Sequence, residues 1–219
     1  QSVELHARIG ELVGDKDFTT ELLKMESNAA APHELMSVII GLKVFGKSIG
    51  SRKDKEFFAR CITGYLYMDG TKENQIRNCF ITMLNSKVID VDRLDYLIRD
   101  AYITGFATIN IDYQRLLKAL TIVEYKEKYQ IAYKKDAVSI IENVVYAHDA
   151  EKKWIQNHPV VLYESYIIKH IIVHLNNKLN EDEKRLFSEA ALSREGVELQ
   201  DGVKVSLLCD DDIIYLYKN

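Results

Sequence analysis

The sequence predicts a mainly α-helical fold with two small β-hairpins. Apolar residues recur three and four positions apart along much of the chain, which is the period of an amphipathic helix. Two stretches alternate instead: 121–133, around Lys126-Glu127-Lys128, and 197–207, around Asp201-Gly202, a pair that favours a tight hairpin turn. We therefore expect two hairpins there and helices at 34–45, 55–67, 73–85, 91–104, 113–120, 138–155, 160–179 and 182–192.

The composition is that of a chain with a buried core. Of 219 residues, 47% are hydrophobic and 28% are charged, far from the values of a disordered chain. A chain of this length forms one domain, or one domain with a small appendage. We expect a single domain over residues 1–219, with a helical and hairpin extension from about residue 180.

Charge, apolar runs and cysteines disfavour several classes of function. The net charge of −4 provides no overall basic field for nucleic acid or anionic lipid. The longest apolar stretches, 38–44 and 167–175, fall well short of the ~20 residues that a membrane span needs. Cys61, Cys79 and Cys209 form no CxxC pair, which argues against a disulfide framework or a cysteine zinc site. We expect a cytoplasmic protein without a membrane or nucleic-acid partner.

The helix predicted at 91–104 has one polar and one apolar face. From spacing alone the polar side is a solvated helix face, with Asp95 and Arg99 as an ion pair worth ~0.3–0.5 kcal/mol. The polar face consists of Asp92, Asp95, Tyr96, Arg99 and Asp100, and the apolar face consists of Leu94, Leu97, Ile98 and Ala101.

The residues of this helix also carry a resemblance to a known family. The string from Asp92-Arg93-Leu94-Asp95-Tyr96 to Arg99-Asp100 resembles the segment with the last metal-binding aspartate in HD-domain phosphohydrolases of the deoxynucleoside triphosphate (dNTP) triphosphohydrolase type. The resemblance implies an HD-domain helical bundle. It also implies that Asp92 binds a divalent metal ion, that Arg93 faces phosphates, and that Tyr96 and Asp100 hold the sugar. Mg, Mn, Fe, Zn and Ni are not distinguished by it.

The resemblance extends to the segment 139–164. It implies that His158 lines the nucleoside pocket, because relatives carry a histidine near this position. Two positions depart from the pattern: His148 stands near a phosphate-binding arginine of relatives, and Gln156 stands near a pocket tyrosine. These departures leave the specificity for triphosphates open.

The start of the chain departs from the family further. The family's metal site needs a histidine and a His-Asp dyad before the aspartate matched by Asp92, and no His-Asp dyad precedes Asp92. In one alignment His6-Ala7 stands at the dyad. In the preferred alignment Gln1 and Glu4 match the His-x-x-Glu that follows the dyad, which makes Glu4 a proton-transfer candidate. We expect the chain to lack the N-terminal part of the site.

His33 opens a predicted helix directly after Pro32. It is either a helix-terminal histidine bonded to backbone or, by resemblance, a catalytic-site residue near metal and phosphates.

The function implied by the resemblance is hydrolysis of a nucleotide substrate by the intact protein, with a dNTP giving deoxynucleoside and tripolyphosphate. One alternative is another phosphoester on the same site. The other is a degenerate, non-catalytic HD module for nucleotide sensing or oligomerisation. Relatives form assemblies, so the resemblance also implies a homo-oligomer, either a dimer or a tetramer.

Overall fold

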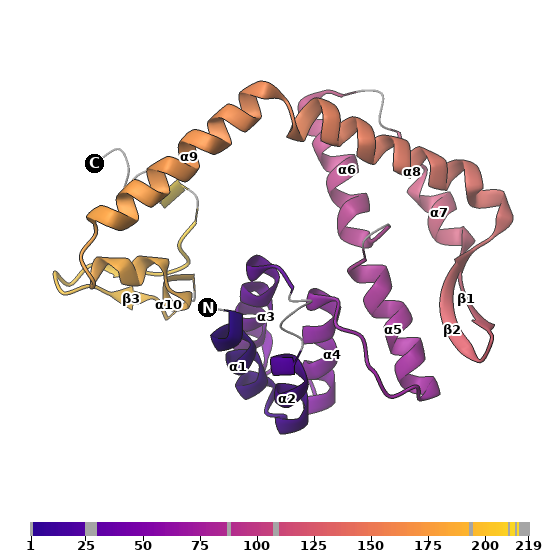
Figure 1. Ribbon diagram of the computed structural model, residues 1–219, viewed down its shortest axis with the longest axis horizontal. Coiled ribbons are helices and arrows are strands. Elements are labelled where there is room, and N and C mark those ends of the chain that lie inside the picture. Colours follow the sequence, from indigo (N-terminus) through magenta and orange to yellow (C-terminus); the bar gives the residue numbers. More distant parts are fainter. Residues whose placement is uncertain are drawn as a thin grey trace. The chain divides into compact units, whose positions relative to one another are not determined.

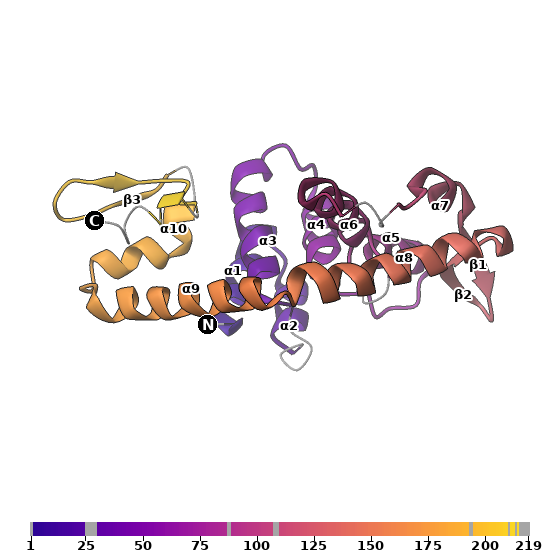
Figure 2. The ribbon, with the colours of Figure 1, turned by 90° about the horizontal axis from the view of Figure 1, so that it is seen from above.

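The mainly helical pattern and both hairpins are confirmed in the computed structural model (Figures 1 and 2). The structure describes residues 2–24, 30–86, 89–106, 110–192, 195–209, 211, 212 and 214. The chain divides into two compact units, Gln1–Glu56 with Leu162–Asn219, and Phe57–Val161. Each unit is described below by itself.

The first unit begins with three helices, α1 (Ser2–Val13), α2 (Lys16–Lys24) and α3 (Pro32–Phe45). Helix α1 contacts both α2 and α3, and side chains such as Ile9 and Leu35 are fully buried between them. The helices α1 and α2 were not predicted. Gly10 interrupts the apolar pattern of α1, and a side chain at Gly10 would collide with Thr19 of α2. Gly10 lacks a side chain, which allows α1 and α2 to approach each other closely. A glycine also lowers the helix propensity of the segment, so the sequence pattern alone did not reveal α1.

The C-terminal part of this unit is less regular than its sequence pattern predicts. Helix α9 (Pro159–Lys178) begins at the end of the second unit and is followed by a 3₁₀ turn, η4 (Glu183–Phe187), and a short helix, α10 (Glu189–Leu192). The single helix predicted at 182–192 is therefore wrong. Asp182 accepts a hydrogen bond from the backbone of Gln200 at 2.8 Å, which ties the turn to the hairpin instead of continuing the helix. That hairpin pairs β3 (Val197–Glu198) with β4 (Lys204–Val205).

The second unit contains the helices that carry most of the predicted site. Helix α4 (Arg52–Thr63) enters it and ends four residues before the predicted end, because Gly64 adopts a left-handed φ of 73°. The core cluster unites α6 (Val91–Thr104), α7 (Tyr113–Ala119) and α8 (Val138–Glu151) with the segment before α7. Its buried members are Leu97, Ile111, Leu116, Ile140, Val144 and Ala147.

A two-stranded ribbon is the only sheet in the described part of the second unit. Strand β1 (Leu120–Tyr125) pairs with β2 (Lys128–Tyr133), with Ile122 opposite Ile131. Lys126 and Glu127 at the turn both have positive φ, as a two-residue type I′ turn requires. The ribbon contacts α5 (Lys72–Leu84), and α8 follows it after a single 3₁₀ turn, η2 (Lys135–Ala137).

The helix predicted at 138–155 is present, but its last residues are π-helical instead of α-helical. The α-helical part ends at Glu151, and Lys152–Gln156 forms a π-helical turn, η3.

Among the residues that the structure describes, no helix combines the length and the apolar character that crossing a membrane requires.

The cap of α6 gives the first testable prediction. Asp90 is only 8% exposed and accepts hydrogen bonds from the backbone N–H groups of Arg93 at 2.7 Å and Ser86 at 3.1 Å. We expect Asp90→Ala to lower the free energy of unfolding by about 1–2 kcal/mol, because it removes a helix cap. The measurement is urea unfolding, with Asp95→Ala on the exposed face of α6 as the control. Equal losses from both variants would contradict the assigned role of Asp90.

Candidate functional site

Helix α6 is held in a fixed rotation about its axis, which decides which side chains face outward. Asp90 caps its first turn, and Gly105 ends it with a left-handed φ of 70°. Leu97 and Ala101 are buried, and α6 contacts α8 along this side. The predicted division is therefore confirmed for Leu97 and Ala101 on the apolar face and for Asp92, Asp95 and Arg99 on the polar face.

The outward face carries the predicted acidic and basic residues. The predicted ion pair is present, with Arg99 Nη1 lying 2.9 Å from Asp95 Oδ2, and Arg99 Nε lies 3.6 Å from Asp100 Oδ1. Both partners of the Asp95–Arg99 pair are more than half exposed, so the pair adds at most about 1 kcal/mol to stability. Asp92 is exposed in the first turn, where the helix dipole favours a carboxylate.

Two residues of α6 lie differently from the simple two-face pattern. Tyr96 was placed on the polar face, but it is half-buried and packs against the core cluster of the second unit. Ile98 was placed on the apolar face, but it is 37% exposed. The backbone of Arg93 is fixed by the Asp90 cap, and its side chain is half-buried. The substrate-binding roles of Arg93 and Tyr96 stay predictions.

The structure brings Asp100 together with the end of α8. Helices α6 and α8 contact each other, and in Figure 1 the last part of α8 crosses near the C-terminal end of α6. There the charges of Asp100 and His148 both act on Glu151, and the Gln156 side-chain N–H donates to Glu151 Oε1 at 2.9 Å. His148 and Gln156 are the two positions at which the chain departs from the family pattern, and both act on Glu151.

Glu151 is a residue of this cluster that sequence reasoning missed. Its side chain is only 1% exposed, and its second oxygen, Oε2, is buried without a hydrogen-bond partner. Burial raises the pKa of Glu151; the hydrogen bond from Gln156 opposes this effect, the Asp100 carboxylate reinforces it, and His148 opposes it. The signal was present in the spacing of α8, because Glu151 occupies the next position of the buried stripe Ile140, Val144 and Ala147.

His158 and His148 are both near the surface. The Nδ1 atom of His158 accepts a 3.3 Å hydrogen bond from the backbone N–H of Val160, at the start of α9. The Nδ1 atom of His148 lies 3.7 Å from Asp149 Oδ1. The predicted role of His158 in a nucleoside pocket stays a prediction.

Glu4 and His33 belong to the first unit and not to the unit that carries α6. Glu4 is exposed on α1, and His33 is exposed in the first turn of α3, where its backbone carbonyl accepts from Ser37 Oγ at 2.8 Å. His6, from the other alignment of the start, is fully buried within α1. Gln1 lies outside the described residues. The catalytic roles of Glu4 and His33 stay predictions.

The described residues do not by themselves form a metal site. Among them, no group of three or more histidine, cysteine, aspartate or glutamate side chains is arranged to hold a metal ion. Asp92 alone supplies one hard oxygen donor, whereas Mg²⁺ and similar ions need several ligands. A resident metal therefore does not fit the described residues without further ligands.

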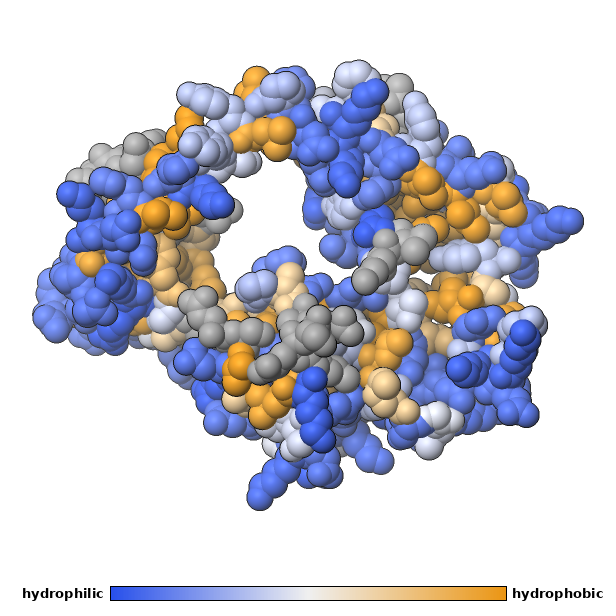
Figure 3. Space-filling view, in the orientation of Figure 1, coloured by the Kyte–Doolittle hydropathy of each residue, from blue (hydrophilic) through white to orange (hydrophobic). Residues whose placement is uncertain are grey.

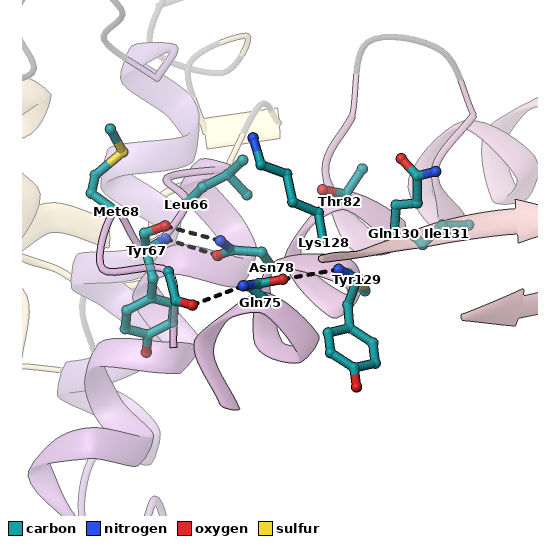
Figure 4. A pocket seen from close by; sticks show the side chains of 12 residues that line it. Leu66, Tyr67, Met68, Gln75, Asn78, Thr82, Lys128, Tyr129, Gln130 and Ile131 are labelled. Atoms are coloured by element: carbon teal, nitrogen blue, oxygen red, sulfur yellow. Dashed lines mark hydrogen bonds between the residues drawn. The ribbon is translucent and has the colours of Figure 1, made fainter. Parts of the chain in front are cut away.

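The second unit also has a cavity of about 540 Å³ between α5, the 66–70 loop before it, and β2 (Figure 4). The amide side chains of Gln75 and Asn78 join the segments that line this cavity by hydrogen bonds. Gln75 donates to the carbonyl of Gly70 at 2.7 Å and accepts from the N–H of Tyr129 at 2.9 Å, and Asn78 bonds both backbone groups of Tyr67. Among the described residues of the lining, Lys128 is the one with a charged side chain, so they include no acid–base pair.

Apolar side chains are exposed elsewhere on this unit, as the space-filling view shows around the ribbon and α7 (Figure 3). Leu117 of α7 is 51% exposed and Ile122 of β1 is 40% exposed.

Comparison with known proteins finds relatives but no family model that matches the chain. The sequence is similar to the uncharacterized protein MJ1154 of Methanocaldococcus jannaschii, with 31% identity over 136 residues, which is 60% of this chain and 30% of the relative. It is also similar to the uncharacterized protein YwfO of Bacillus subtilis, with 29% identity over 146 residues, which is 64% of this chain and 31% of the relative.

A third relative matches a shorter segment of the chain at higher identity. The uncharacterized protein MG461 homolog of Mycoplasma pneumoniae is 40% identical over 76 residues, 35% of this chain and 18% of the relative. The matches thus span less than a third of the length of each of these relatives. Their names assign no activity.

The raised pKa of Cys61 gives a testable prediction about whether its thiol can act as a nucleophile. Burial raises the pKa of the Cys61 thiol to about 11, so roughly 0.1% of it is thiolate near pH 8. We expect iodoacetamide to alkylate Cys61 at least ~100-fold more slowly than free cysteine, because only the thiolate reacts. Peptide mass spectrometry over time measures this rate, with free cysteine in the same tube as the reference. A rate similar to that of free cysteine would show that the thiol is activated.

Proposed function

We propose that the protein is a metal-dependent phosphohydrolase that acts on nucleotides, with a dNTP giving deoxynucleoside and tripolyphosphate. The observation that carries this proposal is the arrangement along α6. Asp92 and Arg93 lie at its N-terminal end, and Asp100, whose charge acts on Glu151 of α8, lies towards its C-terminal end. Asp100 follows Asp92 by eight positions, which is a rise of ~12 Å along the helix. A ligand that engages both ends must therefore be elongated and must offer different chemistry at each end.

The two ends suit the two parts of a nucleotide. An arginine beside the first turn of a helix suits phosphate oxygens, because its guanidinium offers several N–H donors. A carboxylate such as Asp100, about 39% exposed, suits the hydroxyl groups of a sugar, because it only accepts hydrogen bonds when ionised. In the proposed reaction, water attacks the α-phosphorus, the bond to the 5′-oxygen breaks, and the leaving oxygen receives a proton.

The metal ion of this proposal requires ligands beyond the described residues. Asp92 would provide one oxygen, and the remaining ligands would come from elsewhere in the protein or in its assembly. The resemblance supports a homo-oligomer as the working form, and the scattered cysteines support a cytoplasmic location. Glu4 and His33 remain the proposed proton-transfer and phosphate-proximal residues of that complete site.

A second candidate function is a non-catalytic nucleotide sensor. The observation that favours it is the lack of a complete metal-binding group within the described residues. A third possibility is a different phosphoester substrate, favoured by His148 and Gln156 at positions where relatives carry arginine and tyrosine.

The hydrolase proposal predicts the behaviour of Asp92→Ala in the intact protein. We expect at least a ~100-fold loss of tripolyphosphate release and a loss of bound divalent metal, because a ligand is removed. The matched control is Asp95→Ala, which removes an exposed carboxylate from the same helix face and should leave the rate within about twofold.

The outcomes separate the candidates. Release of tripolyphosphate by the wild type and its loss in Asp92→Ala alone support the hydrolase. Nucleotide binding without turnover in the wild type supports the sensor. Release of inorganic phosphate from another phosphoester, with none from any dNTP, supports the third possibility.

A further inference from the structure

The cavity between α5, the 66–70 loop and β2 lies within the second unit, and none of its described lining residues belongs to the proposed hydrolase site. Its volume of about 540 Å³ falls within the range of pockets that bind small molecules, roughly 300–1,000 Å³. The lining combines exposed apolar side chains with a few polar groups, which is the usual composition of such pockets. The cavity therefore has the size and the composition of a small-molecule site.

Hydrogen bonds from α5 fix the other two walls of this cavity (Figure 4). Asn78 of α5 donates to the carbonyl of Tyr67 at 2.9 Å and accepts from the N–H of Tyr67 at 2.8 Å, which fixes the loop. Gln75 of α5 accepts from the N–H of Tyr129 at 2.9 Å, which fixes β2. A pocket whose walls are already ordered loses less conformational entropy when a ligand binds, and this raises its affinity.

Apolar side chains of the loop are exposed at the cavity. Leu66 is 40% exposed and Met68 is 81% exposed. The buried guanidinium of Arg60 donates to the carbonyl of Leu66 at 3.0 Å, which holds the backbone that carries this exposed side chain. Cys79 of α5 and Ile131 of β2 continue the apolar lining. An apolar ligand body that covers this surface removes it from water, which favours binding.

Lys128 gives the cavity a positive charge. Its side chain and that of Gln130 point to the same side of β2, as alternate residues of a strand do (Figure 4). The ammonium of Lys128 forms no ion pair or hydrogen bond with any residue that the structure describes. The carboxylate of the loop, Asp69, lies outside the described lining and accepts hydrogen bonds from Thr71 and Asn74 instead. The charge of Lys128 therefore favours an anionic ligand.

We propose that this cavity binds a small organic anion with a compact apolar body, such as an aryl carboxylate or an aryl phosphate. The anionic oxygens of the ligand lie at the ammonium of Lys128, and the hydroxyl of Thr82 and the amide of Gln130 are further hydrogen-bond donors of the lining. The apolar body lies against Leu66 and Met68. The inference does not depend on the proposed function, because the two sites share no described residue.

The class of ligand is tested with three probes that share one apolar body: naphthyl phosphate, naphthoate and the uncharged naphthamide. Each is titrated into the 219-residue chain, and amide chemical shifts are followed by NMR spectroscopy. We expect at least one of the anions to shift the amides of Cys79, Thr82 and Ile131 in a saturable way, with a Kd of about 1 mM or tighter for a ligand of this size. Naphthamide should bind at least ~5-fold more weakly than that anion, because it lacks the charge that pairs with Lys128.

The relative affinities of the two anions then identify the preferred head group, either phosphate or carboxylate. Three results would overturn the inference: no saturable shift with either anion, shifts confined to residues outside the lining, or naphthamide binding as tightly as both anions.

The role of Lys128 is tested by substitution with the tighter of the two anions. We expect Lys128→Ala to weaken binding by about tenfold, because a hydrogen bond to a charged group is lost, and Lys128→Arg to restore most of the affinity. The matched control is Lys118→Ala, which removes an exposed lysine of α7 outside the described lining and should leave the Kd within about twofold. Equal Kd values for Lys128→Ala and Lys118→Ala would contradict the assigned role of Lys128.

The place of the apolar body is tested by filling the cavity. Thr82 is an exposed residue of α5 in the lining, so Thr82→Phe occupies ligand space without disturbing a buried position. We expect it to weaken binding of the same anion at least ~10-fold, whereas Thr20→Phe, at an exposed position of α2, should have no effect. Binding of Thr82→Phe with the wild-type Kd would show that the ligand lies outside the cavity and would overturn the inference. Activity towards a dNTP is not part of this test, so the proposed function can fail without affecting its outcome.

Discussion

The packing of α6 against α8 is the interaction on which the candidate site depends. Leu97 and Ala101 enter the core of the second unit and leave the charged side of the helix outward. Without this contact the charged residues of α6 would have no fixed direction, and Asp100 would not lie near the end of α8. The cap at Asp90 and the left-handed Gly105 set the length over which the face is presented. Packing and capping of α6 together therefore determine which of its charged side chains face outward.

Much of this unit follows from local rules that the sequence reveals. The bounds of α6 were predicted correctly from its apolar periodicity, and in the structure a capping aspartate precedes the helix and a glycine follows it. The β1–β2 ribbon was predictable from its alternation. The elements that were missed or mispredicted depend on tertiary contacts instead. Helices α1 and α2 approach closely at Gly10, and the segment after Asp182 is tied to the second hairpin by Gln200.

Some residues of the candidate site also follow from local rules, whereas others depend on tertiary contacts. The charged face of α6 was predictable from helical spacing, and the Asp95–Arg99 pair is present as expected. Tyr96 packs against the core, because its large ring gains more from apolar contact than the helical wheel alone suggests. Glu151 was not predicted, since a glutamate within a helix looks like a surface residue unless its register with the buried stripe is counted. The influence of the Asp100 charge on Glu151 requires a contact between α6 and α8 that no local pattern encodes.

Hydrogen exchange of the intact protein with and without dATP tests the central claim, that the charged face of α6 and the end of α8 form one ligand site. The account predicts slower amide exchange in Val91–Thr104, which carries Asp100, and in Lys152–Gln156, the turn that follows Glu151. Protection confined to the cavity between α5 and β2, with no change in these two segments, would contradict it.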